Sequence, residues 1–144
     1  MIVKFFRLIN HASIYLRTLL LGGPNYMIFF ITGRCNLRCS FCFYLDEIEN
    51  ADKERELTVE EISKIAKRSP TLYHITFTGG ETFLRDDFDE IVKLFYRFSN
   101  TRSVTITTNG TYPERVGEMV EEIAKSCPNL IVRLPLSMDG FEGV

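Results

Sequence analysis

The sequence has few cysteines, and it shows neither a clear membrane-spanning segment nor a clear signal peptide. Only four of the 144 residues are cysteines and no secretory signal precedes them, which excludes a disulfide framework like those of small secreted domains. Charges interrupt the apolar start, and no small-residue cleavage site follows it. Neither a signal peptide nor a membrane span of about 20 nearly uncharged residues is therefore indicated. These absences predict a reducing, cytoplasmic setting.

Acidic residues are missing from the first 45 positions. Five basic residues lie before Asp46, which leaves 12 of the 17 basic side chains and all 19 acidic ones for the rest of the chain. The net charge of −2 points to no particular partner, and no nucleic acid is expected. The length fits one domain, which can bury a core without disulfide bonds.

The first segment, residues 1–23, is predicted to be a basic amphipathic helix that precedes a domain over residues 24–144. Apolar side chains recur at helical spacing over residues 2–21, and the basic side chains mostly fall between them. Gly22 and Gly23 would end this helix. It either packs on the domain or lies on an anionic membrane surface, and we prefer packing because amphipathic helices mostly face a core.

Four apolar runs of strand length alternate with three amphipathic stretches of helical length in the second segment. The runs are residues 26–32, 73–78, 103–108 and 130–138. Thr58 with Glu61 is typical of a capping box, Asp86 can cap the second helix, and Pro113 suits the first turn of the third. Such repeats predict an α/β fold with a parallel sheet and right-handed crossovers.

Alternation along the predicted strands assigns side chains to the two faces of this sheet. Arg133 and Ser137 are expected on the face that would become a barrel interior, together with threonines of the second and third strands, Thr76, Thr78, Thr105 and Thr107. The apolar side chains Val132, Leu134, Leu136 and Met138 are expected to meet the helices.

The unusual residues follow the strands, and ligands of such sheets bind beyond the carboxyl ends of the strands. The segments are residues 35–42, 79–81, 108–110 and 137–140. Cys35, Cys39 and Cys42 form a Cys-x3-Cys-x2-Cys pattern, and thiolates so close together bind zinc, copper(I) or an iron–sulfur cluster. Structural zinc takes four protein ligands, and no fourth lies near in sequence. A cubane with three thiolates keeps one iron open for a small molecule.

At these residues the sequence closely resembles the radical S-adenosylmethionine (radical SAM) superfamily. The marks are the cysteine pattern with Phe41 before its last cysteine, Gly79-Gly80-Glu81 after the second strand, TNG after the third and SMDG after the fourth. The resemblance covers roughly residues 26–144 and implies a partial (βα)6 barrel, of which about four βα units are present. Many family members have proline after Gly-Gly-Glu, whereas Thr82 stands here, so a less rigid backbone is expected.

The resemblance implies a [4Fe–4S] cluster held by the three cysteines, with S-adenosylmethionine chelated by the open iron and reductively cleaved to a radical. Phe41 would lie against the adenine. Gly79 and Gly80 would bring backbone carbonyls to the methionine ammonium, and Glu81 would add negative charge there. Ser137 is the first candidate for a ribose contact. The further candidates are Thr108, Asn109 and Asp139.

The resemblance leaves the reaction and the catalytic residues open. The expected partners are S-adenosylmethionine, an electron donor such as flavodoxin or ferredoxin, and a peptide or small-molecule substrate, as in peptide modification or cofactor biosynthesis. We expect this chain to be the N-terminal part of a longer protein, since the family barrel has six βα units. The alternatives are a non-enzymatic iron–sulfur or zinc-binding module and a truncated fragment without activity.

Overall fold

The computed structural model describes Ser13, Leu16, residues 19–20 and residues 22–138. Most of the predicted N-terminal helix, and Asp139, lie outside the described residues. In the described part, no helix is long and apolar enough to cross a membrane.

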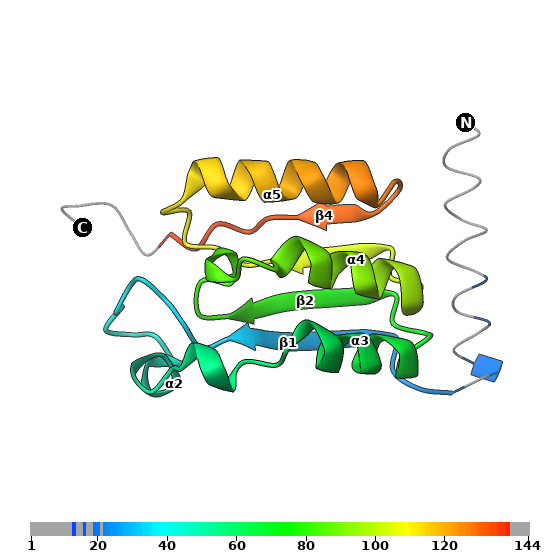
Figure 1. Ribbon diagram of the computed structural model, residues 1–144, viewed down its shortest axis with the longest axis horizontal. Helices are drawn as coiled ribbons and strands as arrows, with labels where there is room; N and C mark the ends of the chain where they lie inside the picture. The colour runs from blue at the N-terminus through cyan, green and yellow to red at the C-terminus, as the bar shows by residue number, and fades with distance from the viewer. Residues whose placement is uncertain (1–12, 14–15, 17–18, 21, 139–144) are drawn as a thin grey trace.

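Four parallel strands form one sheet in the order β1-β2-β3-β4 (Figure 1). Their bounds are β1 Tyr26–Thr32, β2 His74–Gly79, β3 Ser103–Ile106 and β4 Ile131–Arg133. The connecting helices are α2 Leu45–Glu49, α3 Val59–Arg68, α4 Phe88–Phe98 and α5 Pro113–Ser126, with short 3-10 turns at Lys53–Arg55 and Thr82–Leu84. The predicted α/β fold with a parallel sheet is confirmed.

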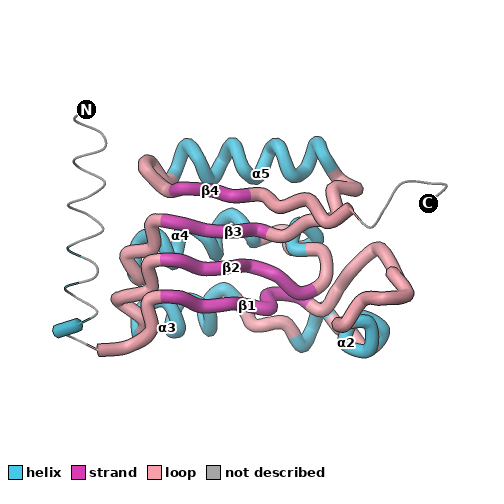
Figure 2. Tube along the Cα trace, turned by 180° about the vertical axis from the view of Figure 1, so that it is seen from behind, coloured by secondary structure: helices cyan, strands magenta, loops and turns pink. Residues whose placement is uncertain are grey.

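Helices α3, α4 and α5 lie on the same side of the sheet. Figure 2, seen from behind, shows the strands in front of α3 and α4, with α5 along the β4 edge. The core lies between these two layers. Ile75 and Phe77 of β2 and Phe95 of α4 are completely buried there. Burial of these side chains holds the sheet to the helices, because each large apolar side chain removed from water contributes about 1.5–3 kcal/mol.

The other face, which we call the open face, carries the polar side chains that alternate with the apolar ones along the strands. Tyr26 stacks on His74 with ring centroids 5.2 Å apart, and its hydroxyl lies 3.1 Å from the Thr76 hydroxyl. Ser103 lies between the His74 ring, at 2.9 Å, and the Arg133 guanidinium, which donates to its hydroxyl. The predicted positions of Thr76 and Arg133 on this face are therefore confirmed.

Strand β1 contains one irregularity close to the site. Phe30 pairs with Thr78 and Thr32 with Gly79, so Ile31 is an extra residue in the ladder. Because of this bulge, both Ile31 and Thr32 are buried, and the strict in-and-out alternation of β1 ends there. The chain then leaves the sheet toward the end of β2.

Three sequence predictions are wrong in detail. β4 stops at Arg133, because Pro135 has no N–H to donate, and only an isolated bridge between Thr108 and Leu136 continues the pairing. Beyond this point Leu134, Leu136 and Met138 are exposed, so they are not buried under the helices as expected. The side chain of Asp86 does not cap α4. The N-cap is Asp87, and Asp86 instead pairs with Lys53 and Arg115, which are distant in sequence.

The other predicted helix starts agree with the structure. Thr58 and Glu61 make both hydrogen bonds of the capping box at the start of α3. Pro113 occupies the first turn of α5, where its missing N–H leaves no partner unsatisfied.

Candidate functional site

The carboxyl ends of all four strands open on one cavity of about 350 Å³. Its lining includes ten of the eleven residues predicted from the sequence, namely Cys35, Cys39, Phe41, Cys42, Gly79, Gly80, Glu81, Thr108, Asn109 and Ser137. The eleventh, Asp139, lies outside the described residues. Thr78 and Thr107, from the open face of the sheet, also line the cavity. Segments more than 90 residues apart in sequence are thus brought to one place, as expected for parallel strands.

The cysteine loop is short and tightly turned. The Cys42 amide donates to the Cys39 carbonyl at 3.0 Å, and the Leu45 amide donates to the Cys42 carbonyl at 3.2 Å, which leads the chain into α2. The Leu37 amide lies 3.4 Å from the Cys35 sulfur and donates to it. None of the three cysteines is in a disulfide, and all are partly exposed. The thiols are therefore accessible from the cavity.

Cys35, Cys39 and Cys42 bring three thiols to the lining of one cavity. In the part of the chain that the structure describes, no three cysteine, histidine, aspartate or glutamate side chains are grouped as ligands of one metal ion. A cubane takes one thiolate on each of three irons, so its ligands lie farther apart than those of one tetrahedral zinc. Three soft donors around one cavity, with an amide donor to sulfur, suit an iron–sulfur cluster.

Gly79 and Gly80 are required by the close passage of the cysteine loop. The Gly80 amide donates to the Thr32 carbonyl and the Glu81 amide to the Arg34 carbonyl, each at 2.8 Å. A Cβ atom on Gly80 would lie 2.5 Å from the Arg34 carbonyl carbon, and one on Gly79 would clash with the Thr32 carbonyl. Gly79 also has φ +120°, a conformation that side chains rarely adopt. These glycines therefore fasten the loop to the end of β2.

The side chain of Glu81 turns inward, and its residue is only 2% exposed. One carboxylate oxygen accepts from the Thr108 hydroxyl at 2.8 Å and from the Phe83 amide at 3.2 Å. The other oxygen accepts from the Asn109 amide at 2.7 Å. The carboxylate thus joins the loops after β2 and β3, a structural role that the sequence pattern did not indicate.

Asn109 joins the loop after β3 to the cysteine loop. Its side-chain amide donates to the side-chain oxygen of Asn36, Oδ1, at 2.9 Å and lies 3.9 Å from the Cys35 sulfur. Its own carbonyl oxygen accepts from the Thr111 amide and hydroxyl. This side chain therefore faces a sulfur atom and the loop, and its whole hydrogen-bonding capacity serves the wall of the cavity.

Phe41 and Ser137 lie at the mouth of the cavity. The Phe41 residue is 66% exposed although its ring is apolar, and Ser137 is exposed while its amide donates to the Thr108 carbonyl at 2.9 Å. A flat apolar ring can contact a base, and a hydroxyl can contact a sugar. Their predicted contacts with adenine and ribose stay predictions.

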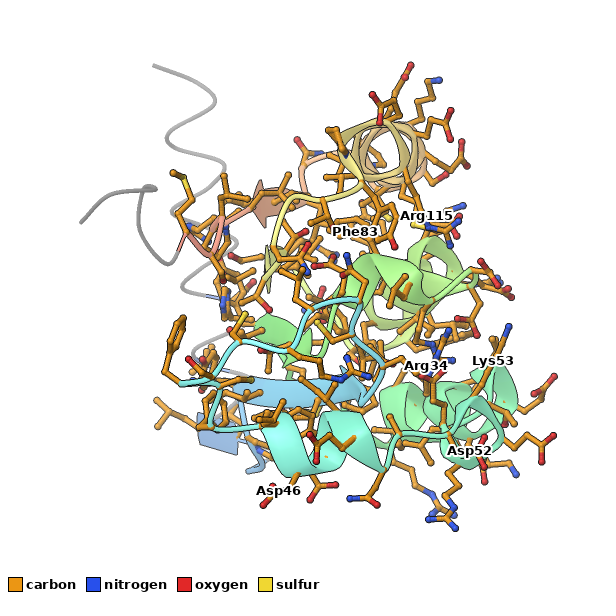
Figure 3. The ribbon with its side chains drawn as sticks, turned by 90° about the vertical axis from the view of Figure 1, so that its left-hand side faces the viewer. Arg34, Asp46, Asp52, Lys53, Phe83 and Arg115 are labelled. Atoms are coloured by element: carbon orange, nitrogen blue, oxygen red, sulfur yellow. The ribbon has the colours of Figure 1, made fainter. Side chains whose placement is uncertain are left out.

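A polar network behind the cysteine loop was not predicted. Glu56 accepts from Arg34, and Arg85 donates to Asp87 and to main-chain carbonyls. Figure 3 shows Arg34 on the helix side of the molecule. The Glu56 carboxylate raises the pKa of Arg34, and the hydrogen bonds from Arg85 lower the pKa of Asp87. The only signal in the sequence was the position of Arg34 directly before Cys35.

Comparison with known proteins agrees with this geometry. The model of the radical SAM superfamily matches residues 29–142. A GTP 3',8-cyclase of Alkaliphilus oremlandii is 33% identical over 110 residues, covering 75% of this chain and 34% of the relative. A GTP 3',8-cyclase of Clostridium botulinum is 31% identical over 120 residues, covering 82% and 36%. A probable GTP 3',8-cyclase of Methanocella arvoryzae is 39% identical over 94 residues, covering 64% and 29%.

The chain spans about a third of the length of these relatives. Its four-stranded parallel sheet with alternating helices corresponds to part of a radical SAM barrel. The family match covers most of the chain, from within β1 to beyond β4, and includes the cysteine loop and every strand end around the cavity. The chain therefore belongs to the radical SAM superfamily, and it is related to enzymes.

Proposed function

We propose that this protein is a radical SAM enzyme that cleaves S-adenosylmethionine reductively. The observation that carries the proposal is the single cavity to which the three cysteines, Gly79-Gly80 and the ends of β3 and β4 all contribute. A bound [4Fe–4S] cluster would supply the electron for this cleavage. The residues that would hold it are Cys35, Cys39 and Cys42.

The chain's own residues bind and orient the cosubstrate in this proposal. The carbonyl groups of Gly79 and Gly80 accept from the methionine ammonium, while the Glu81 carboxylate keeps the loops after β2 and β3 in place. Phe41 covers the adenine, and Ser137 bonds to the ribose. Thr108 and Asn109 contribute mainly through the hydrogen bonds that shape the cavity wall.

Anaerobic reconstitution of the intact protein with iron and sulfide tests this proposal. We expect about four irons per chain, as in one cubane, and 5′-deoxyadenosine after reduction in the presence of S-adenosylmethionine. Cys39→Ala should abolish both. Cys127→Ala is the matched control, because Cys127 is buried at the end of α5, outside the cavity, and should keep both. One tightly bound zinc ion and no cluster would contradict the proposal and favour a zinc-binding module.

A nucleotide substrate is a second, narrower candidate. The relatives reported above are named GTP 3',8-cyclases, and the described strands contain no acidic residue. Arg133 supplies positive charge on their open face, among hydroxyl groups and the imidazole ring of His74. Such a surface suits an anionic substrate such as a nucleoside triphosphate. Reconstituted protein should then convert GTP to a product of altered chromatographic retention. Unchanged GTP alongside complete cleavage of S-adenosylmethionine would exclude this substrate.

The electron donor of the proposed reaction is a low-potential carrier such as flavodoxin or ferredoxin. Replacing a chemical reductant with either reduced protein should sustain formation of 5′-deoxyadenosine.

A further inference from the structure

The carboxylate of Glu56 lies behind the cysteine loop, and its side chain is only 10% exposed. It accepts from the Thr32 hydroxyl and, through both oxygens, from the Arg34 guanidinium, with Nε at 2.8 Å and Nη2 at 3.1 Å. Thr32 ends β1, and Arg34 directly precedes Cys35. One carboxylate therefore holds both ends of the short segment from which the first cysteine projects.

A second guanidinium extends this contact to the neighbouring loops. Arg85 is 3% exposed, and its Nη1 lies 3.9 Å from Glu56. It donates to the carbonyls of Ile31, at 3.1 Å, and Leu57, at 3.0 Å, and to both carboxylate oxygens of Asp87. The end of β1, the segment before α3 and the loop after β2 are thus joined around Glu56. Without the negative charge of Glu56, the positive charges of Arg34 and Arg85 would be less well neutralised.

The opposite side of the same segment is fixed by the main chain. The carbonyls of Thr32 and Arg34 accept from the amides of Gly80 and Glu81. Glu56 acts on the side chains of Thr32 and Arg34, whereas the amides act on their carbonyls. The segment is therefore held from two sides, and the position of Cys35 relative to Gly79 and Gly80 depends on both.

We propose that Glu56 is a positioning residue for the cluster-binding loop, acting through Thr32 and Arg34 on the placement of Cys35. The inference rests on the proposed function, since it concerns how firmly the cysteines hold a cluster and how the cavity receives S-adenosylmethionine. Groups that orient metal ligands from outside typically change metal affinity by about 10- to 100-fold when they are removed.

The test compares Glu56→Gln with Glu54→Gln in the intact, reconstituted protein. Glu54 is exposed and two residues away, so the control makes the same chemical change outside the network. We expect Glu56→Gln to lose iron to a chelator about 10- to 100-fold faster than the parent protein. We also expect the electron paramagnetic resonance spectrum of its reduced cluster to respond less to S-adenosylmethionine. Glu54→Gln should match the parent in both measurements.

Two further variants keep the test decisive if Glu56→Gln folds poorly. Thr32→Val removes the hydroxyl that donates to Glu56 and accepts from the Arg34 amide, while it keeps the ion pair. Glu56→Asp keeps the charge with a shorter reach. Both should fall between the parent protein and Glu56→Gln in iron loss and in spectral response. If the folded variants keep the parent's iron retention and spectrum, the positioning role is wrong. If the parent protein itself takes up no cluster, the proposed function is wrong, and this inference is wrong with it.

Discussion

Replacing Gly80 with alanine should open the contact between the cysteine loop and the end of β2. The added Cβ would lie 2.5 Å from the Arg34 carbonyl carbon, closer still to its oxygen, and 3.0 Å from the Gly33 oxygen. Ordinary van der Waals contact begins at 3.4 Å, so the Arg34 carbonyl carbon would have to retreat by about 0.9 Å and its oxygen by more. The atoms in the way belong to the main chain and cannot rotate aside.

The cost can be worked from the groups that this movement disturbs. Overpacking of this kind typically costs about 1–3 kcal/mol. The two main-chain hydrogen bonds from Gly80 and Glu81 each contribute about 0.5–1.5 kcal/mol and would be stretched or lost. The free energy of unfolding should therefore fall by about 2–6 kcal/mol.

Gly117→Ala is the matched control, because this glycine lies in α5 and an added Cβ would meet nothing within 4 Å. It should raise the free energy of unfolding by about 0.5–1 kcal/mol, the usual helical preference for alanine. Urea unfolding of the cluster-free chain, followed by circular dichroism, measures both values. Equal unfolding midpoints for Gly80→Ala and the parent protein would show that the close passage is not needed.

Three further changes have definite expected outcomes in the same unfolding assay. Thr82→Val should stabilise the chain by about 1–3 kcal/mol, because the buried Thr82 hydroxyl has no hydrogen-bond partner among the described residues; a loss of stability would contradict this. Glu81→Gln should destabilise it by about 1.5–3 kcal/mol through loss of a charged acceptor shared by three donors, and an unchanged midpoint would show that the carboxylate's charge is not needed. Burial, with Arg133 nearby, lowers the pKa of His74, so the unfolded chain binds a proton first. Stability should therefore fall as the pH drops through about 6.5, and His74→Gln should flatten that part of the profile.

Short-range patterns predicted the local structure well, and long-range partners explain what was missed. The capping box at Thr58 depends on residues three apart, and the placement of Thr76 and Arg133 depends on simple alternation. Both features can therefore be predicted from neighbouring positions in the sequence. Asp86 lies where an N-cap residue is usual. Its carboxylate instead forms ion pairs with Lys53 and Arg115, which come from other elements.

The candidate site divides in the same way. The residues that line the cavity carry recognisable motifs at strand ends, and the fold of parallel strands brings them together. Glu56 and Arg85 carry no motif, because their roles come from contacts with residues more than 20 positions away, such as Arg34 and Ile31. The inward turn of Glu81 likewise depends on Thr108 and Asn109, which only the folded chain brings near.

The bulge at Ile31 has a consequence for anyone who would transplant this cysteine loop into another protein. The extra residue changes the phase of β1 before the loop begins, and so sets the direction in which the chain leaves the sheet. In a graft that started at Thr32, the cysteine loop would leave the recipient sheet in a different direction. The smallest portable unit therefore begins at Phe30, and it needs a recipient strand that ends in two glycines like Gly79 and Gly80.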